Sequence, residues 1–130
     1  MARRPSKYPT ELELEILKVL WRDGESSVRH VKQALKGFRK LAYTSVMTMM
    51  TIMTEKGYLK RRKKSNYYIY KPLITEETIT SGMLGDVVER LFDGSAMAAM
   101  VNLLETGDID EAELAKLRKL IRRKGKEVQK

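Results

Sequence analysis

The fold is decided by residues 43–72, which read YTSVMTMMTIMTEKGYLKRRKKSNYYIYKP. Apolar side chains recur there at three- and four-residue steps up to Gly57, and this spacing predicts a helix that begins near Tyr43. The members of its buried stripe are Val46, Met49, Met50 and Met53. Hydroxyl side chains occupy the opposite side, so this helix has one face for a core and another for a partner.

The sequence after Gly57 has the composition of a β-hairpin. Residues 58–62 and 67–70 form two short runs, the second rich in aromatic and β-branched side chains, and Lys64-Ser65-Asn66 between them is a turn signal. Pro72 ends the second strand, because proline has no backbone N–H to give to the ladder.

Two helices are predicted before residue 43. The first begins with a capping box between Thr10 and Glu13 and ends at Asp23-Gly24. The second is capped by Ser26 or Ser27 and ends at Gly37. Their apolar positions are Leu12, Ile16, Val19, Leu20, Val28, Val31 and Leu35. Two helices, a third helix and a basic hairpin, in this order, are typical of a winged helix-turn-helix domain.

The sequence after Pro72 is helical again, over about residues 75–92, 95–105 and 110–124. We therefore expect a mainly α protein with a small β-hairpin wing, divided into a winged helix-turn-helix DNA-binding domain (1–72) and a three-helix dimerisation domain (73–130). So short a helical segment buries little apolar surface alone, which favours pairing with a second copy. The expected dimer contacts are Leu84, Val87, Val88, Leu91, Phe92, Met97, Met100, Val101, Leu104, Leu117 and Leu120.

Charge is distributed along the chain in three zones. Residues 1–72 carry 17 Lys and Arg against 6 Asp and Glu, residues 73–115 carry 1 against 10, and residues 116–130 carry 8 against 1. The net charge of +9 favours polyanionic partners. The chain has no cysteine and no apolar run near the roughly 20 residues that span a bilayer. We expect a cytoplasmic protein without membrane insertion.

The first turns of the third predicted helix carry candidate DNA-binding residues. Thr44, Ser45 and Thr48 lie opposite the buried stripe, and helix-turn-helix proteins present this part of the helix to the major groove. Short hydroxyl side chains allow close approach and hydrogen bonds to bases or phosphates. Tyr43 is placed to reach a backbone phosphate. The alternative is that these are ordinary solvated positions on a helix surface.

The run of five cations at residues 60–64 lies on and beside the hairpin turn, where the charges repel one another unless an anion neutralises them. The candidate phosphate contacts are Arg61, Arg62, Lys63, Lys64 and Asn66. The alternative is an edge strand that its charge protects from aggregation. Arg3, Arg4 and Lys7 form either a mobile arm that adds nonspecific affinity or merely a tail.

Nothing in the sequence favours an enzyme, a metal site or a cofactor. His30 is the only histidine, so the chain cannot assemble a cluster of histidines around a metal. Asp108, Asp110, Glu111 and Glu113 are crowded, but their spacing fits neither a calcium loop nor a catalytic carboxylate pair, and helix capping explains them. The sequence has no glycine-rich phosphate loop and no serine elbow.

The stretches LAYTSVMT (41–48), EKGYL (55–59) and YIYKP (68–72) resemble the penicillinase repressor group, also called BlaI/MecI/CopY, and ELELEIL (11–17) and LFDGS (91–95) fit as well. The resemblance implies a homodimer on an inverted-repeat operator, held by an intertwined C-terminal helical domain, that blocks transcription. It also implies that the helix positions at Thr44, Ser45 and Thr48 face DNA. The wing, residues 61–66, would touch the DNA backbone.

The resemblance implies less about induction. In the β-lactam-responsive branch, a membrane sensor protease triggers cleavage within the dimerisation domain, and the matching bond here is Asn102–Leu103. Leucine stands where an aromatic residue is expected after the cut. The copper-responsive branch needs a cysteine-rich motif that this chain lacks. Group members often have arginine in place of Ile52, and a Gly-Arg pair in place of Ser65-Asn66.

Two alternatives to a specific repressor stay open at this point. An architectural or nucleoid-associated protein would use the same basic surface without reading sequence. A protein-interaction module would use the acidic helices to recruit a partner. The dependence of DNA binding on salt and on sequence separates these functions from repression.

Overall fold

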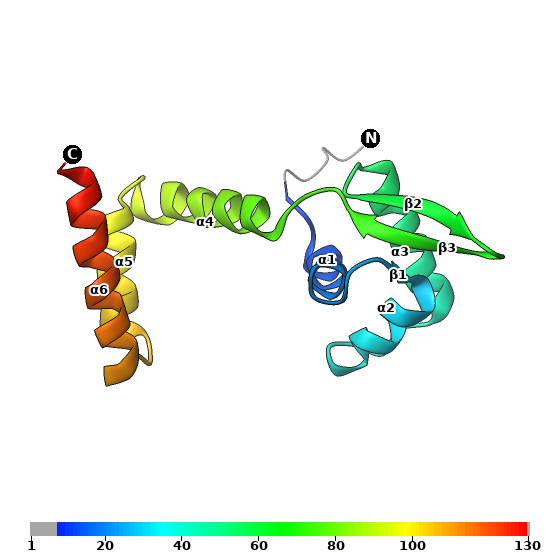
Figure 1. Cartoon of the computed structure of the whole chain (residues 1–130), viewed down its shortest axis with the longest axis horizontal. Helices are drawn as coiled ribbons and strands as arrows, with labels where there is room; N and C mark the ends of the chain where they lie inside the picture. Colours follow the sequence, from blue (N-terminus) through cyan, green and yellow to red (C-terminus); the bar gives the residue numbers. More distant parts are fainter. Residues whose placement is uncertain (1–7, 130) are drawn as a thin grey trace. The chain divides into compact units, whose positions relative to one another are not determined.

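The computed structural model describes residues 8–129, so Arg3, Arg4 and Lys7 lie outside the described part (Figure 1). The described residues form two compact units, residues 8–84 and 85–129. The boundary expected after Pro72 lies earlier in the chain than the boundary between these units. The chain just after Pro72 packs with the first unit, because Trp21 Nε1 donates to the Ile74 carbonyl at 2.9 Å and Ile79 is buried.

The helices of the first unit are α1 Glu11–Asp23, α2 Val28–Ala34, the 3-10 turn η1 Leu35–Gly37 and α3 Tyr43–Glu55. The predicted capping box is present: the Glu13 N–H donates to the Thr10 hydroxyl at 3.3 Å, and the Thr10 N–H donates to the Glu13 carboxylate at 2.8 Å. Ser27, of the two candidate serines, caps α2. Gly24 ends α1 with a φ of +81°, which glycine adopts without strain.

The hairpin joins a three-stranded antiparallel sheet. Its strands are β1 Ser26–Ser27, β2 Leu59–Lys64 and β3 Tyr67–Pro72, in the order β1-β3-β2. The register places Leu59 opposite Pro72 and Lys64 opposite Tyr67, with a tight turn at Ser65-Asn66. The predicted hairpin is confirmed. The strand β1 was not predicted, because two residues are too few to show an alternating pattern.

The core of the first unit lies between the three helices and the base of the hairpin. Its buried members are Ile16, Leu17, Val19, Leu20, Val28, Val31, Leu35, Val46, Met50, Met53, Leu59 and Tyr70. Leu12 and Met49, which were expected inside, are partly buried at its margin. This arrangement is the winged helix-turn-helix fold, and it orients α3 with one face inward and one face outward.

Three helices follow the hairpin, as the sequence predicts: α4 Glu76–Phe92, α5 Ala96–Thr106 and α6 Glu111–Val128. The helix α4 runs across the boundary between the two units. Ser95 caps α5, and Asp110 with Glu113 forms a capping box on α6. No residue between 85 and 129 is buried. None of the helices in the described part has the length and apolarity of a membrane span.

Candidate nucleic-acid interface

The outward face of α3 presents the hydroxyl side chains that the sequence singles out. Thr44, Ser45 and Thr48 are exposed, and among the described residues their hydroxyls have no hydrogen-bond partner. The hydroxyls of Thr51 and Thr54, later in the helix, differ because they donate to backbone carbonyls one turn earlier, at 2.9 and 2.8 Å. Hydroxyl groups that can bond to an outside partner are therefore concentrated in the first two turns of α3.

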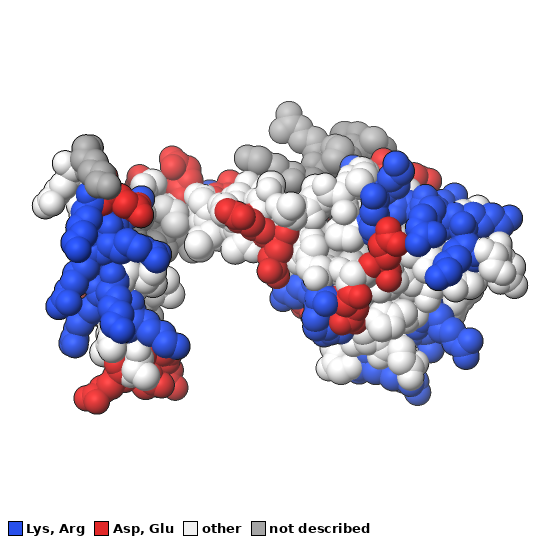
Figure 2. All heavy atoms as spheres, viewed as in Figure 1, with Lys and Arg blue, Asp and Glu red and all other residues white. Residues whose placement is uncertain are grey.

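The cations of the hairpin are all exposed but are not equivalent (Figure 2). Cross-strand partners share a face, so Arg61 and Lys63 project on one side of the hairpin and Arg62 on the other. The Arg61 guanidinium lies 4.3 Å from the ring centroid of Tyr68, which fixes its orientation. Arg62 is paired with Glu25 at 2.9 Å. Lys60 and Lys64 share the face of Arg62 and have no such carboxylate partner among the described residues, so unneutralised cations remain on both faces of the hairpin.

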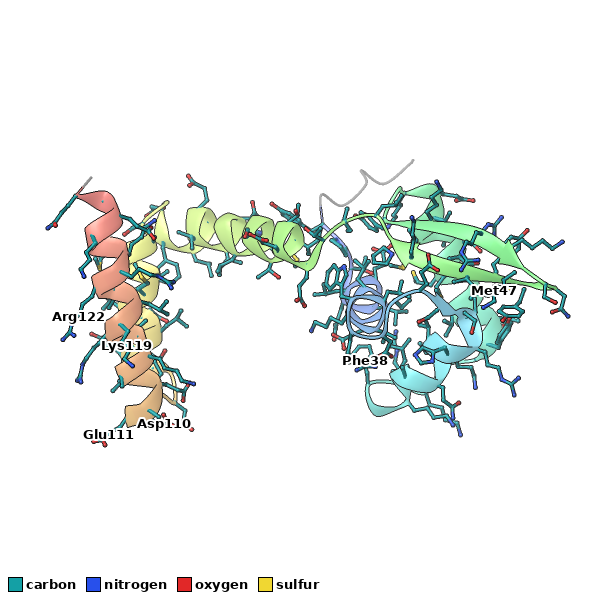
Figure 3. All side chains as sticks on the ribbon, viewed as in Figure 1. Phe38, Met47, Asp110, Glu111, Lys119 and Arg122 are labelled. Atoms are coloured by element: carbon teal, nitrogen blue, oxygen red, sulfur yellow. The ribbon has the colours of Figure 1, made fainter. Side chains whose placement is uncertain are left out.

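A groove of about 960 Å³ lies between α2, the start of α3 and the hairpin. Its lining residues are Ser27, Val28, Arg29, Lys32, Gln33, Tyr43, Met47, Asn66, Tyr67, Tyr68 and Tyr70. The groove brings together Tyr43 and Asn66, two of the predicted DNA-binding residues. Met47, labelled in Figure 3, lies on its α3 side and is 41% exposed. Thr44, Ser45 and Thr48 are not among its lining residues.

Three lining residues of the groove were missed by the sequence analysis. Arg29, Lys32 and Gln33 are spaced i, i+3 and i+4, so they share one face of α2, away from the buried Val31. This spacing was the signal in the sequence that could have identified the three residues as one polar face of α2. Cationic, amide and phenol side chains around one groove are the groups that hold phosphates of a nucleic acid backbone. The α2 side of the groove therefore joins α3 and the hairpin in one candidate interface.

A buried carboxylate ties the end of α3 to the start of α1. Glu13 is 1% exposed, and its second oxygen accepts from Lys56 Nζ at 2.8 Å, directly after α3. Burial raises the pKa of Glu13, but hydrogen bonds from Lys56 and Thr10 outweigh it, and the net pKa lies below the usual value. The charged pair thus fixes α3 against the scaffold that carries it.

A second link fixes α2 against the end of α1. Hydrogen bonds from Arg22 and from His30 hold the pKa of the Asp23 carboxyl well below its usual range. The Asp23 to His30 Nε2 distance is 2.8 Å. His30, the lone histidine, therefore has a structural partner. Within residues 8–129, no three His, Cys, Asp or Glu side chains gather as metal ligands would.

The expected dimer contacts of the second unit form an apolar surface that the single chain leaves open. Leu91 and Met97 are 73% and 66% exposed. Exposed with them are Val87, Met100, Val101, Leu104 and Leu120, whereas Val88, Phe92 and Leu117 are half-buried. Leu84, in the first unit, is also exposed. Asn102 and Leu103 lie exposed within α5, where the Asn102 carbonyl accepts from the Thr106 hydroxyl at 2.7 Å.

Comparison with known proteins gives a consistent result. The sequence model of the family described as "Penicillinase repressor" matches residues 9–123. The transcriptional regulator BlaI of Mycobacterium tuberculosis is 31% identical over 105 residues, which are 79% of this chain and 76% of that protein. The penicillinase repressor of Bacillus licheniformis is 22% identical over 112 residues, 86% of this chain and 88% of that protein. A solved structure of a MarR family protein from Bacillus stearothermophilus is similar in fold, with a TM-score of 0.53 and 18% identity over 94% of this chain and 76% of that one.

Proposed function

This chain belongs to the penicillinase repressor family, whose model matches residues 9–123, and from that premise we propose that it is a transcriptional repressor that binds an inverted-repeat operator as a homodimer. The observation that carries the proposal is the row of exposed, unpartnered hydroxyls at Thr44, Ser45 and Thr48 in the first turns of α3. This is the part of a winged helix-turn-helix that reads base edges. The relatives of this chain that are named as a transcriptional regulator and a penicillinase repressor support the same proposal. A repressor of this kind acts in the cytoplasm, where its DNA lies, and is not an enzyme.

Recognition divides between the two kinds of side chain at the interface. The α3 hydroxyls donate to or accept from bases, and threonine also offers a methyl group to a thymine methyl. Phosphate contacts come from the hairpin and from the α2 side of the groove, and they set register without reading sequence. The proposed phosphate contacts are Tyr43, Arg29, Lys32, Arg61, Lys63, Lys64 and Asn66. Arg62 contributes less, because Glu25 already neutralises it.

Dimerisation supplies the second half of the recognition surface. The residues of 85–129 bury no side chain by themselves, although α4, α5 and α6 carry many large apolar residues. An apolar surface of this extent is typical of an interface rather than of a soluble monomer. A twofold-symmetric pair of chains binds two half-sites of opposite orientation, which is the geometry of an inverted repeat.

Relief of repression by a membrane sensor protease is part of the same proposal. Cutting Asn102–Leu103 would divide α5 and detach α6 from α4, which splits the apolar surface used for dimerisation. Both residues are exposed, which supports access to this bond. The bond lies inside a helix, so α5 must unwind locally before a protease can bind it in an extended form.

The alternative function is that of an architectural protein that binds DNA without reading sequence. Selection of bound fragments from randomised and genomic DNA, at about 0.15 M salt, separates the two because this salt suppresses purely electrostatic binding. The repressor is expected to enrich one inverted repeat and to bind it at least about 10³-fold more tightly than unrelated DNA. Fragments without a common sequence would contradict repression and support the architectural function.

A further inference from the structure

The helix α6 has a strongly cationic face. Lys119, Arg122 and Lys126 are spaced i, i+3 and i+7, so they lie in one row along the helix, opposite Leu117 and Leu120. Arg118 and Arg123 flank this row. All five cations are exposed, and we call them the α6 basic face. Figure 3 shows Lys119 and Arg122 extending from the same side of α6, and Figure 2 shows Lys and Arg gathered over the middle of this helix, with Asp and Glu toward its ends.

Little within the described part of the chain neutralises this face. The one ion pair found on α6 joins Lys124 to Glu127 at a loose 3.9 Å and leaves the row out. Glu113 is engaged in the helix cap, where it accepts from the Asp110 N–H at 3.4 Å. Like charges three or four residues apart on a helix repel one another and destabilise it. A row of this kind is therefore stabilised by an anion from outside the chain.

We propose that the α6 basic face is a second DNA-binding surface, which contacts backbone phosphates without reading sequence. Duplex DNA carries one negative charge per roughly 1.7 Å of its axis, so it can neutralise a row of cations along a helix. The proposal rests on the proposed function for the presence of DNA as partner. The α6 contact goes beyond the proposed function, because neither α3 nor the hairpin takes part in it.

Two other anionic partners fit the observations less well. A membrane-surface helix inserts its apolar face into the lipid, but the apolar side of α6 carries Leu117 and Leu120, which we assign to the dimer. Acidic side chains of a second copy are a sparser partner than DNA. Three of the ten acidic residues in 73–115 are already engaged, since Asp86 is paired with Arg90 at 3.4 Å and Asp110 and Glu113 cap α6, and the rest are more widely spaced than the phosphates of a duplex. A row of cations is sufficient to bind the phosphate backbone of DNA, because that contact depends on charge alone.

The test compares two full-length double variants of equal charge. K119Q/R122Q removes two cations of the α6 basic face, and R90Q/K124Q removes two cations that already have carboxylate partners. The dissociation constant of each for a 60-base-pair duplex of arbitrary sequence is measured by fluorescence anisotropy from 50 to 300 mM salt. Each lost phosphate contact lowers the slope of log K against log salt by about 0.9. We expect K119Q/R122Q to lower it by about 1.8 per protomer and R90Q/K124Q to leave it unchanged.

Other outcomes would overturn the proposal. Equal slopes for wild type and K119Q/R122Q, with wild type binding DNA, would refute the α6 contact and leave the proposed function intact. Absence of DNA binding by the wild type would refute the proposed function itself. Loss of binding to phosphatidylserine vesicles in K119Q/R122Q, without a change in the DNA slope, would identify a membrane surface instead. A dimer weakened by K119Q/R122Q alone, measured by sedimentation equilibrium at the same salt, would assign the face to the partner subunit.

Discussion

Replacing Lys56 with methionine tests how firmly α3 is fixed to its scaffold. Among the described residues, Lys56 supplies the one cation that contacts the buried Glu13 carboxylate. Breaking a fully buried ion pair costs about 3 to 5 kcal/mol, because the remaining charge stays buried without a partner. The Lys56 side chain is 35% exposed, and water therefore screens part of the interaction. We expect Lys56→Met to lower the free energy of unfolding by about 2 kcal/mol at pH 7.

The loss should depend on pH in a defined direction. In the wild type the pKa of Glu13 is lowered from 4.5, so its contribution to stability is present above about pH 4.5 and is lost as the pH falls through the lowered pKa. Without Lys56, only the hydrogen bonds from Thr10 oppose the effect of burial on the pKa of Glu13, so the ionised carboxylate stabilises the variant less than it stabilises the wild type. The difference between wild type and variant should therefore be largest at neutral pH and shrink toward pH 4.

Unfolding in guanidinium chloride, followed by the fluorescence of Trp21, measures the difference in stability between wild type and variant for the first unit, residues 8–84. Trp21 is the only tryptophan, and it lies in α1 against the core. Lys18→Met is the matched control, because Lys18 pairs with Glu15 on the surface and its loss should cost at most about 0.5 kcal/mol. Adding Glu13→Gln to the Lys56 variant should restore stability at pH 7. A pH-independent loss, or a loss no larger than that of the control, would refute the reasoning.

Three further predictions concern DNA binding and assembly. Thr48→Ala should weaken binding to the selected operator by about 1 to 3 kcal/mol and relax the preference at one base position, whereas Lys63→Gln should weaken binding to all sequences alike. Equal, sequence-independent losses of affinity for both variants would show that α3 is not the helix that reads the bases. Arg29→Gln should reduce the salt slope of DNA binding by about 1 per protomer, as measured by anisotropy, and an unchanged slope would exclude the groove from the interface. Leu91→Glu should raise the dimer dissociation constant at least about 100-fold in sedimentation equilibrium, because it places an unpaired carboxylate in an apolar interface. An unchanged dissociation constant would show that Leu91 lies outside the dimer interface.

The fold could be predicted from the sequence where the local signals are strong. The buried stripe of α3, the capping boxes at Thr10 and Asp110, and the change of periodicity after Gly57 each specify an element through its own residues. The strand β1 could not be predicted, since its two serines are defined only by pairing with Tyr70 and Ile69, more than 40 residues away. Such pairing leaves no local pattern.

The candidate interface likewise has parts that local sequence patterns reveal and parts that depend on contacts between distant segments. The α3 hydroxyls and the hairpin cations are consecutive or helically spaced, so the sequence reveals them. The groove depends on α2, α3 and β3 meeting in space, and for this reason Arg29, Lys32 and Gln33 were missed. The ion pair of Arg62 with Glu25, 37 residues apart, distinguishes one cation of the hairpin from its neighbours in a way that a run of like charges cannot show.

The central claim is that two copies of α3 enter the major groove at two symmetric half-sites, and hydroxyl-radical footprinting of the full chain on its selected operator tests it most directly. We expect two protected regions related by a twofold axis, with centres about 34 to 36 Å apart or a multiple of that spacing, because a dimer of this fold meets the same side of the helix once per turn. Protection that is continuous, or confined to a single half-site at saturating protein, would contradict the account.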